Sequence, residues 1–219
     1  MVGLAVDDAG HSPVWIATLD GRSPPRRLSS LDCVRALFGV HNDVYFVGGE
    51  TTATSFLYHV NTDGSGLQKV VQNRVLFLYD VSPDGKWLAA WEDRAIVLYS
   101  SDGKTRRLIC DSCGTAGGED RGITPPMVSW SRDGRRIYVH ETPSGHENPT
   151  SKTYVISLPP GRMVLEAPAS QVRSAAEAIA AAGGGHFLAE ERVFPSPDPS
   201  VYAFPRLAAH RNIFRIRVP

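Results

Sequence analysis

The chain has 219 residues, with 23 basic residues (Lys and Arg) balanced by 23 acidic ones (Asp and Glu), so its formal net charge is +0. A neutral chain excludes a whole-chain electrostatic argument for binding nucleic acid or an anionic membrane. Its 42% hydrophobic content suffices for a core, and 20 Gly and 16 Pro favour a fold made of many turns.

The N-terminal region, 1–30, contains three short apolar segments around an Asp20-Gly21 turn, namely Gly3–Val6, Val14–Leu19 and Arg26–Leu28. They resemble the last three strands of a four-stranded unit that lacks its first strand. The first residues carry no basic segment and reach an acid at Asp7, which is not the pattern of a signal peptide. No apolar run approaches the roughly 18 residues that span a bilayer.

Two complete units follow, at 34–71 and 74–109, each with four short apolar segments. In the first unit the segments are Val34–Phe38, Val44–Val47, Ser55–Val60 and Leu67–Val71. In the second unit they are Leu76–Val81, Lys86–Trp91, Arg94–Tyr99 and Lys104–Ile109. Asp-Gly turns lie at Asp63-Gly64, Asp84-Gly85 and Asp102-Gly103, since Asp bonds its own backbone and Gly accepts a positive φ, while the first turn of the first unit, His41-Asn42-Asp43, is degenerate. We therefore expect antiparallel hairpins.

The next unit, 126–166, repeats the pattern with segments Met127–Trp130, Arg135–His140, Lys152–Leu158 and Arg162–Glu166, and with an insertion at Pro143–Thr150. The Ala-rich stretch Ser170–Ala182 has no strand period and ends at three glycines, so we predict a short helix near 170–182. A last unit, 190–219, contains what resemble the first three strands of another sheet, Arg192–Phe194, Val201–Phe204 and Asn212–Val218.

A repeat of roughly 40 to 50 residues predicts an all-β fold, a β-propeller of four-stranded antiparallel blades. We expect a single domain over 1–219 with about five blades visible, at 1–30, 34–71, 74–109, 126–166 and 190–219, two of them incomplete. The incomplete ends are compatible with a ring closed by both termini or with truncation. An open ring would expose strand edges, so homodimers are also considered.

The hairpins with Ser-Pro-Asp-Gly-Lys at 82–86 resemble the repeats of TolB-like propellers. Ala209–Ile216 resembles the end of TolB-like propeller domains that follow a transmembrane segment in some bacterial serine/threonine kinases, and Cys110-Asp-Ser-Cys113 is similar to the same group. This resemblance implies a sensor or interaction domain. Kinase activity is not implied, because the chain has no Gly-rich phosphate loop, no His-Arg-Asp and no Asp-Phe-Gly.

Cys110 and Cys113 have the spacing of half a zinc site or of a redox pair. No second Cys-x-x-Cys or His-x-His pair completes a four-ligand site, so a structural role and a local disulfide are weighed beside metal. His140, Glu141 and His146 with Asp133 form another metal candidate, against the alternative of a solvated loop. In the loop Gly114–Pro126, Glu119, Asp120 and Arg121 are candidates, with His146, for contacting a partner.

Trp15, Trp87, Trp91 and Trp130 are interpreted as core between blades rather than as a stacking platform. The basic pairs Arg26-Arg27, Arg106-Arg107 and Arg135-Arg136 are interpreted as solvated protection of strand edges, against the alternative of a surface for an acidic partner.

The sequence thus predicts a non-catalytic propeller that binds a protein or small-molecule ligand on one face. No cofactor, nucleic acid or membrane segment is expected. The alternative is an accessory propeller of a multidomain enzyme, a kinase or a hydrolase. Localisation stays open: cytoplasmic by default, periplasmic or extracellular if the chain is a piece of a membrane kinase.

Overall fold

The computed structural model describes residues 1–4, 10–49, 54–93, 95–110, 115–116, 123–124, 127–140, 153–159, 185–188, 193–196, 198 and 201–204. The first two sheets are built from β1 (Val2–Leu4), β2 (Val14–Ile16), β3 (Arg26–Arg27), β4 (Asp32–Phe38), β5 (Asp43–Gly49), β6 (Phe56–Asn61) and β7 (Gln68–Arg74). The third contains β8 (Phe77–Val81), β9 (Trp87–Glu92), β10 (Ala95–Ser100) and β11 (Arg106–Cys110). The remaining strands are β12 (Thr115–Ala116), β13 (Ile123–Thr124), β14 (Met127–Trp130), β15 (Arg136–His140), β16 (Thr153–Ser157), β17 (Gly185–Leu188), β18 (Phe194–Pro195) and β19 (Tyr202–Ala203).

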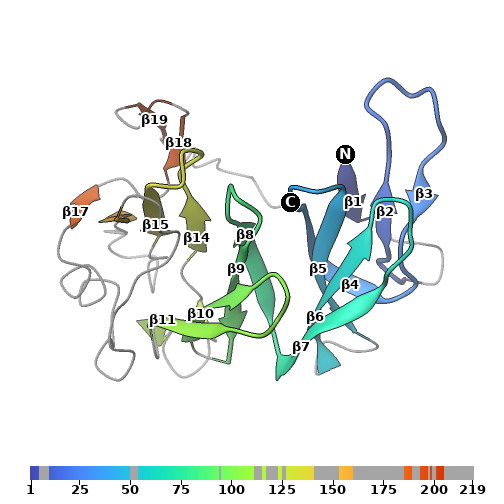
Figure 1. Cartoon of the computed structure of the whole chain (residues 1–219), viewed down its shortest axis with the longest axis horizontal. Helices are drawn as coiled ribbons and strands as arrows, with labels where there is room; N and C mark the ends of the chain where they lie inside the picture. The colour runs from blue at the N-terminus through green and yellow to red at the C-terminus, as the bar shows by residue number, and fades with distance from the viewer. Residues whose placement is uncertain are drawn as a thin grey trace, which may run out of the picture.

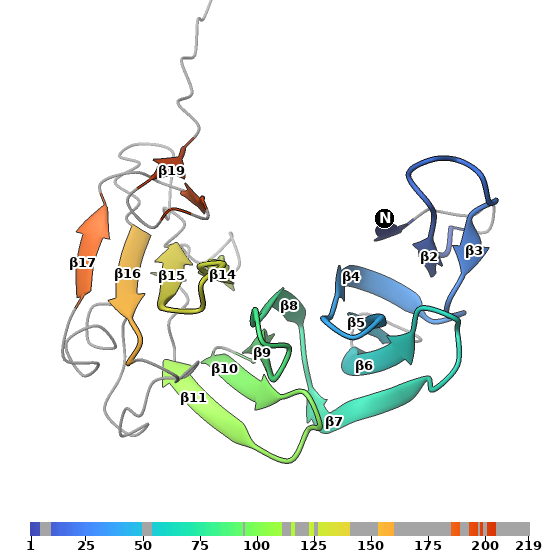
Figure 2. The same ribbon diagram turned by 45° about the horizontal axis from the view of Figure 1, so that its top comes forward.

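These strands form separate antiparallel sheets rather than one continuous sheet. Three have four strands, in the orders β4-β5-β6-β7, β8-β9-β10-β11 and β14-β15-β16-β17, and one has three, β1-β2-β3. The first strand of each sheet contacts the first strand of the next, β1 with β4, β4 with β8 and β8 with β14. The sheets therefore follow one another along an arc with their first strands innermost, which confirms the predicted all-β propeller architecture (Figures 1 and 2).

The core lies between neighbouring sheets. Tyr45, Leu57, Leu78, Leu88 and Val97 belong to one buried cluster shared by the β4–β7 and β8–β11 sheets. A second cluster joins the β8–β11 and β14–β17 sheets, and a third joins the N-terminal sheet to β4–β7. Burying a side chain such as Leu78, which is 0% exposed, stabilises the fold by about 1.5–3 kcal/mol, so each interface is a major source of stability.

The Ser-x-Asp-Gly turns repeat the same hydrogen bonds. At 82–85, the Ser82 hydroxyl donates to Asp84 Oδ1 at 2.7 Å, and Asp84 also accepts the backbone N–H of Lys86 at 3.1 Å. The same bonds recur at Ser100–Gly103 and Ser131–Gly134. Each glycine has positive φ, 71° at Gly85. The serine and aspartate side chains are therefore occupied by turn formation, as the sequence predicts.

These turns gather at one end of the sheets. Backbone bonds join the two turns of each sheet, from Thr62 N–H to Asn42 O, from Ser101 N–H to Lys86 O and from Leu158 N–H to Arg135 O. We call this end the turn face. Since strand direction alternates, the other connections leave from the opposite end, for example between the paired residues His140 and Thr153.

Two sequence predictions need comment. The fourth strand of the β14 sheet was expected at Arg162–Glu166, which lies outside the described residues, and the fourth position is instead held by β17, paired with β16 from Thr153↔Leu188 to Ile156↔Gly185. Antiparallel pairing requires only a strand with a suitable register, so the strand that pairs with β16 can follow it after a long connection. The helix expected near 170–182 lies outside the described residues, and the number of blades and the extent of the domain stay predictions.

Candidate functional site

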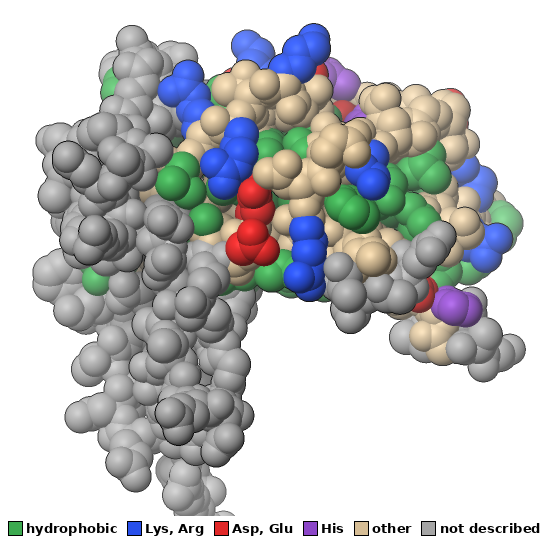
Figure 3. Space-filling view, turned by 90° about the horizontal axis from the view of Figure 1, so that it is seen from below, with side chains coloured by type: hydrophobic (Ala, Val, Ile, Leu, Met, Phe, Trp, Pro, Cys, Tyr) green, Lys and Arg blue, Asp and Glu red, His purple; other side chains and the backbone are tan. Residues whose placement is uncertain are grey.

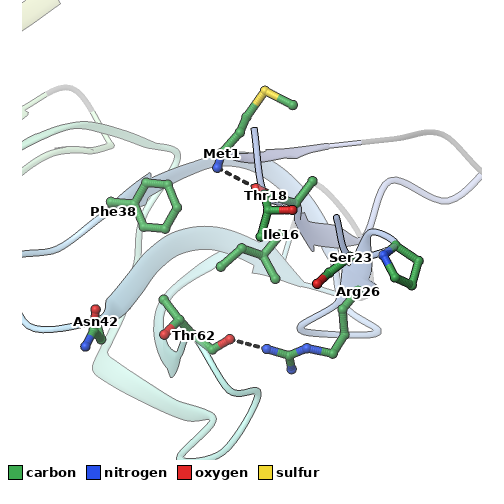
Figure 4. Close-up of a pocket in the computed structure, with 10 residues that line it drawn as sticks. Met1, Ile16, Thr18, Ser23, Arg26, Phe38, Asn42 and Thr62 are labelled. Atoms are coloured by element: carbon green, nitrogen blue, oxygen red, sulfur yellow. Dashed lines mark hydrogen bonds between the residues drawn. The ribbon is translucent and has the colours of Figure 1, made fainter. Parts of the chain in front are cut away.

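A hollow with a mixed apolar and polar lining lies on the turn face, between the N-terminal sheet and the β4–β7 sheet (Figure 4). Its volume is about 410 Å³. It is lined by Met1, Ile16, Ala17, Thr18, Ser23, Pro24, Arg26, Phe38, Asn42 and Thr62. Ligand sites in proteins commonly have volumes of about 300–1,000 Å³, so the hollow is large enough for a small ligand or for a side chain of a partner.

Apolar groups form one side of this hollow. Phe38 ends β4 and pairs with Val44, but its ring is 43% exposed, whereas the neighbouring β5 residues are buried. Ile16 ends β2 and faces the same space (Figure 4). An exposed phenylalanine beside an open hollow leaves apolar area in water that a ligand would cover.

Polar groups form the other side. Arg26 of β3 reaches across to the β6–β7 turn, where its guanidinium donates to the carbonyl oxygens of Asp63, at 2.7 Å, and Thr62. Asn42, with φ 58°, accepts the Thr62 N–H at 2.8 Å and fixes that turn. The ten lining residues include no carboxylate. An acidic group that acts on Arg26 is the Asp63 carboxyl in the same turn, whose pKa is lowered by hydrogen bonds from Ser65 and by the Arg26 charge. The lining therefore combines an apolar wall with hydroxyl groups and one guanidinium.

A smaller hollow of about 160 Å³ lies near the start of β4 and includes Ser12, Asp32 and Cys33 in its lining. His11 lies 3.1 Å from Asp32, and this contact, with the Ser12 N–H, holds the pKa of the Asp32 carboxyl below its usual range. Burial raises the pKa of the Cys33 thiol to about 12. The thiol therefore stays protonated at neutral pH and is a poor nucleophile or metal ligand.

The residues predicted for metal or partner binding are only partly described. The backbone of Cys110 lies at the end of β11, opposite Ile96. Cys113, Glu119, Asp120, Arg121, Glu141 and His146 lie outside the described residues, so their roles stay predictions. His140 is buried at the end of β15, with its Nδ1 2.9 Å from the Thr153 hydroxyl, while Asp133 belongs to a turn. Across the part of the chain that the structure describes, no three His, Cys, Asp or Glu side chains cluster as metal ligands.

The tryptophans lie largely as predicted. Trp91 and Trp130 are buried in the cluster between sheets, Trp87 packs against it, and Trp15 is partly buried in β2. The arginine pairs are not merely solvated: Arg26 binds the β6–β7 turn, Arg106 pairs with Glu92 at 2.9 Å, and Arg107 lies over the Trp87 ring at 5.5 Å. The interpretation of these arginines as solvated edge residues was therefore too simple.

Sequence reasoning missed the hollow beside Phe38. Its residues come from Met1, β2, β3, β4 and three turns, and none of these segments carries a local sequence signal for a site. The available signal was Val40, an apolar residue at a turn position where the β8–β9 and β14–β15 turns carry Pro83 and Arg132.

No known family model matches the sequence, and no curated protein matches it. Among solved structures, a protein assigned as TolB from Agrobacterium tumefaciens shares 14% identity and a TM-score of 0.54, over 72% of this chain and 57% of that one. The tricorn protease (16% identity, TM-score 0.49) covers 67% of this chain and 14% of the protease, and TolB from Acinetobacter baumannii (15%, 0.44) covers 71% and 49%.

At this identity the first of these similarities shows the fold alone. The chain spans a little over half the length of the A. tumefaciens protein. In the described residues, no helix is long and apolar enough to cross a membrane. The arrangement of the sheets and the similarity together show that the chain contains a β-propeller domain of the TolB-like fold.

Proposed function

We propose that this domain is a non-catalytic binding module whose ligand occupies the hollow beside Phe38. The observation that carries the proposal is the 43% exposed Phe38 ring at the edge of a hollow of about 410 Å³. A soluble fold gains little from leaving a large aromatic side chain exposed beside an open interface, whereas a ligand that covers it gains hydrophobic free energy.

The lining indicates the chemistry of the ligand. An apolar group would pack against Phe38 and Ile16, and an anionic or carbonyl group would lie toward the Arg26 guanidinium, whose charge no lining carboxylate offsets. Such a ligand is a small amphipathic molecule or an apolar side chain next to an acidic one in a protein partner. The absence of catalysis is part of the proposal. It is supported by the turn serines and aspartates, which bond to each other and to the backbone rather than to a reacting group.

The test uses 1-anilinonaphthalene-8-sulfonate, a dye with an aromatic body and one sulfonate, whose fluorescence rises on apolar contact. We expect the folded protein to bind it, and Phe38→Ser to weaken that binding by about tenfold, since a phenyl group contributes roughly 1.5–3 kcal/mol when buried. Leu67→Ser is the matched control, because Leu67 is 44% exposed but does not line the hollow.

Near-ultraviolet circular dichroism must show native packing in each variant, since the dye also binds partly unfolded states. Dye binding that survives Phe38→Ser unchanged, or that falls equally in Leu67→Ser, would contradict the proposal.

A further inference from the structure

The outer strands of three successive sheets carry basic residues and no acidic ones. β3 contains Arg26 and Arg27, β7 contains Lys69 and Arg74, and β11 contains Arg106 and Arg107. Each is the last strand of its sheet. We call these six residues the basic rim. Because the chain as a whole is neutral, this is a local separation of charge and not a consequence of composition.

The three outer strands form one surface. Arg26 binds the turn that leads into β7, through the carbonyls of Thr62 and Asp63. The turn that leads into β11 packs on β7 so closely that a Cβ on Gly103 would lie 2.0 Å from the Val70 carbonyl oxygen. Seen from below, over β7 and β11, the described surface shows Lys and Arg side chains in greater number than Asp and Glu, with apolar side chains between them (Figure 3).

Among the ion pairs of the described residues, Arg106 of the basic rim pairs with Glu92, and none joins Lys69 or Arg107 to a carboxylate. The turn aspartates are occupied elsewhere: Asp102 pairs with Lys104 at 3.3 Å and accepts the Ser100 hydroxyl at 2.6 Å. On the basic rim, Lys69 lies 3.5 Å above the Phe56 ring and Arg107 lies 5.5 Å above Trp87. Cation–π contacts orient a cation but do not neutralise it. The surface therefore presents positive charge beside partly buried aromatic rings.

We propose that the basic rim binds an acidic, extended segment of a partner protein. Carboxylates spaced along such a segment can reach Arg27, Lys69 and Arg107, while intervening apolar side chains pack near Phe56 and Trp87. A continuous polyanion fits less well, because it carries no apolar side chains to pack against the rings of Phe56 and Trp87. This surface is distinct from the hollow beside Phe38, with Arg26 alone common to both.

The test measures fluorescence anisotropy of a labelled peptide of alternating glutamate and leucine. The variant is Arg27→Glu/Lys69→Glu, which leaves Arg26 and the hollow intact. The matched control is Lys86→Glu/Arg135→Glu, which makes the same change in net charge at exposed turn residues outside the basic rim. Thermal unfolding of each variant confirms that it is folded.

We expect the wild-type protein to bind the peptide, and binding to weaken as salt is raised. The Arg27→Glu/Lys69→Glu variant should bind about tenfold more weakly, because each reversal replaces an attraction by a repulsion, and the control should bind within about twofold of wild type. Absence of peptide binding, or an equal loss in the control, overturns the proposal. Tighter, basic-rim-dependent binding of polyuridylate RNA or of phosphatidylserine vesicles overturns the choice of an acidic protein segment.

Discussion

Two interfaces between neighbouring sheets are built from the same repeat and closed in different ways. Between the β4–β7 and β8–β11 sheets, apolar side chains fill the space and Glu92 accepts hydrogen bonds from Asn73 of the first sheet and from Tyr99 and Arg106 of the second. Between the N-terminal sheet and β4–β7, Arg26 bridges to two carbonyls and the hollow beside Phe38 stays open.

The difference shows where binding capacity lies in a repeated fold. Where each turn packs directly on the preceding sheet, as Gly103 does on Val70, no space remains for a ligand. At the equivalent turn of the β4–β7 sheet, which faces the N-terminal sheet, a Cβ on Gly64 would meet only the Arg26 side chain, 3.0 Å from Nη1. The loosely closed interface is therefore the one able to accept another molecule.

The largest expected effect comes from filling the tight turn. Gly103→Ala would place a Cβ 2.0 Å from the Val70 carbonyl oxygen at φ +73°, so the turn or β7 must move. We expect a loss of about 3 kcal/mol in the free energy of unfolding, from the collision together with left-handed strain. Urea titration measures it.

Gly64→Ala is the matched control, with φ +87° and only the flexible Arg26 Nη1 within 4 Å of the new Cβ, and it should cost only about 1 kcal/mol from backbone strain. Equal losses in the two variants would show that the two turns are packed alike and would remove the contrast between the interfaces.

Glu92→Ala should have the next largest effect. The Glu92 residue is 9% exposed, and its carboxylate accepts the hydrogen bonds of Asn73, Tyr99 and Arg106, which the substitution removes. We expect a loss of about 2 kcal/mol in the free energy of unfolding. The loss is moderated because the Arg106 side chain is 41% exposed and water can solvate it. Asp93→Asn, at the exposed neighbouring residue, is the control and should be nearly neutral. A Glu92→Ala protein as stable as Asp93→Asn would mean that apolar packing alone closes this interface.

Arg26→Ala should cost less, about 1 kcal/mol, because an exposed guanidinium loses two hydrogen bonds to carbonyls that water then solvates. Its effect should be local. Amide hydrogen exchange should accelerate in β2 and β3 and not in β8–β11. A uniform acceleration across the domain would indicate that the N-terminal sheet unfolds together with the rest.

The regular part of this fold was accessible from the sequence for a physical reason. Ser-x-Asp-Gly specifies a hairpin by bonds within five residues, as Ser82 and Asp84 show, so the turn can be recognised without tertiary context. The order of four strands follows from counting hairpins. The exception is β17, whose pairing with β16 spans a long connection and depends on register alone.

The candidate site was not accessible in the same way. Phe38, Arg26 and Ile16 lie in different elements, and the distance between them depends on how two sheets pack, which no local pattern encodes. The basic pairs and their edge positions were visible in the sequence, but only the structure shows the contacts that join β3, β7 and β11 into one surface. Local turn chemistry is thus readable from a single chain, whereas a surface assembled from several sheets is not.

The smallest expected effect is a pH dependence of the free energy of unfolding, which should differ between the two interfaces. Burial raises the pKa of Glu92, but hydrogen bonds from Arg106, Tyr99 and Asn73 outweigh it and hold the pKa below the ordinary value of 4.5. The contribution of Glu92 to stability is therefore complete above that value and is lost as the pH falls through the lower, folded-state pKa.

In urea titrations from about pH 6 to about pH 3, the stability difference between wild type and Glu92→Gln should shrink toward acid, because glutamine does not titrate. The difference between wild type and Arg26→Ala should change less over the same range, since Arg26 donates to backbone carbonyl oxygens, which do not titrate. The remaining change comes from the Asp63 carboxyl, whose pKa is lowered mainly by Ser65 and to a smaller extent by Arg26. Parallel pH profiles for both variants would mean that Glu92 does not act as a charged acceptor. Diverging profiles would show that acid loosens the closed interface and leaves the bridge beside the hollow intact.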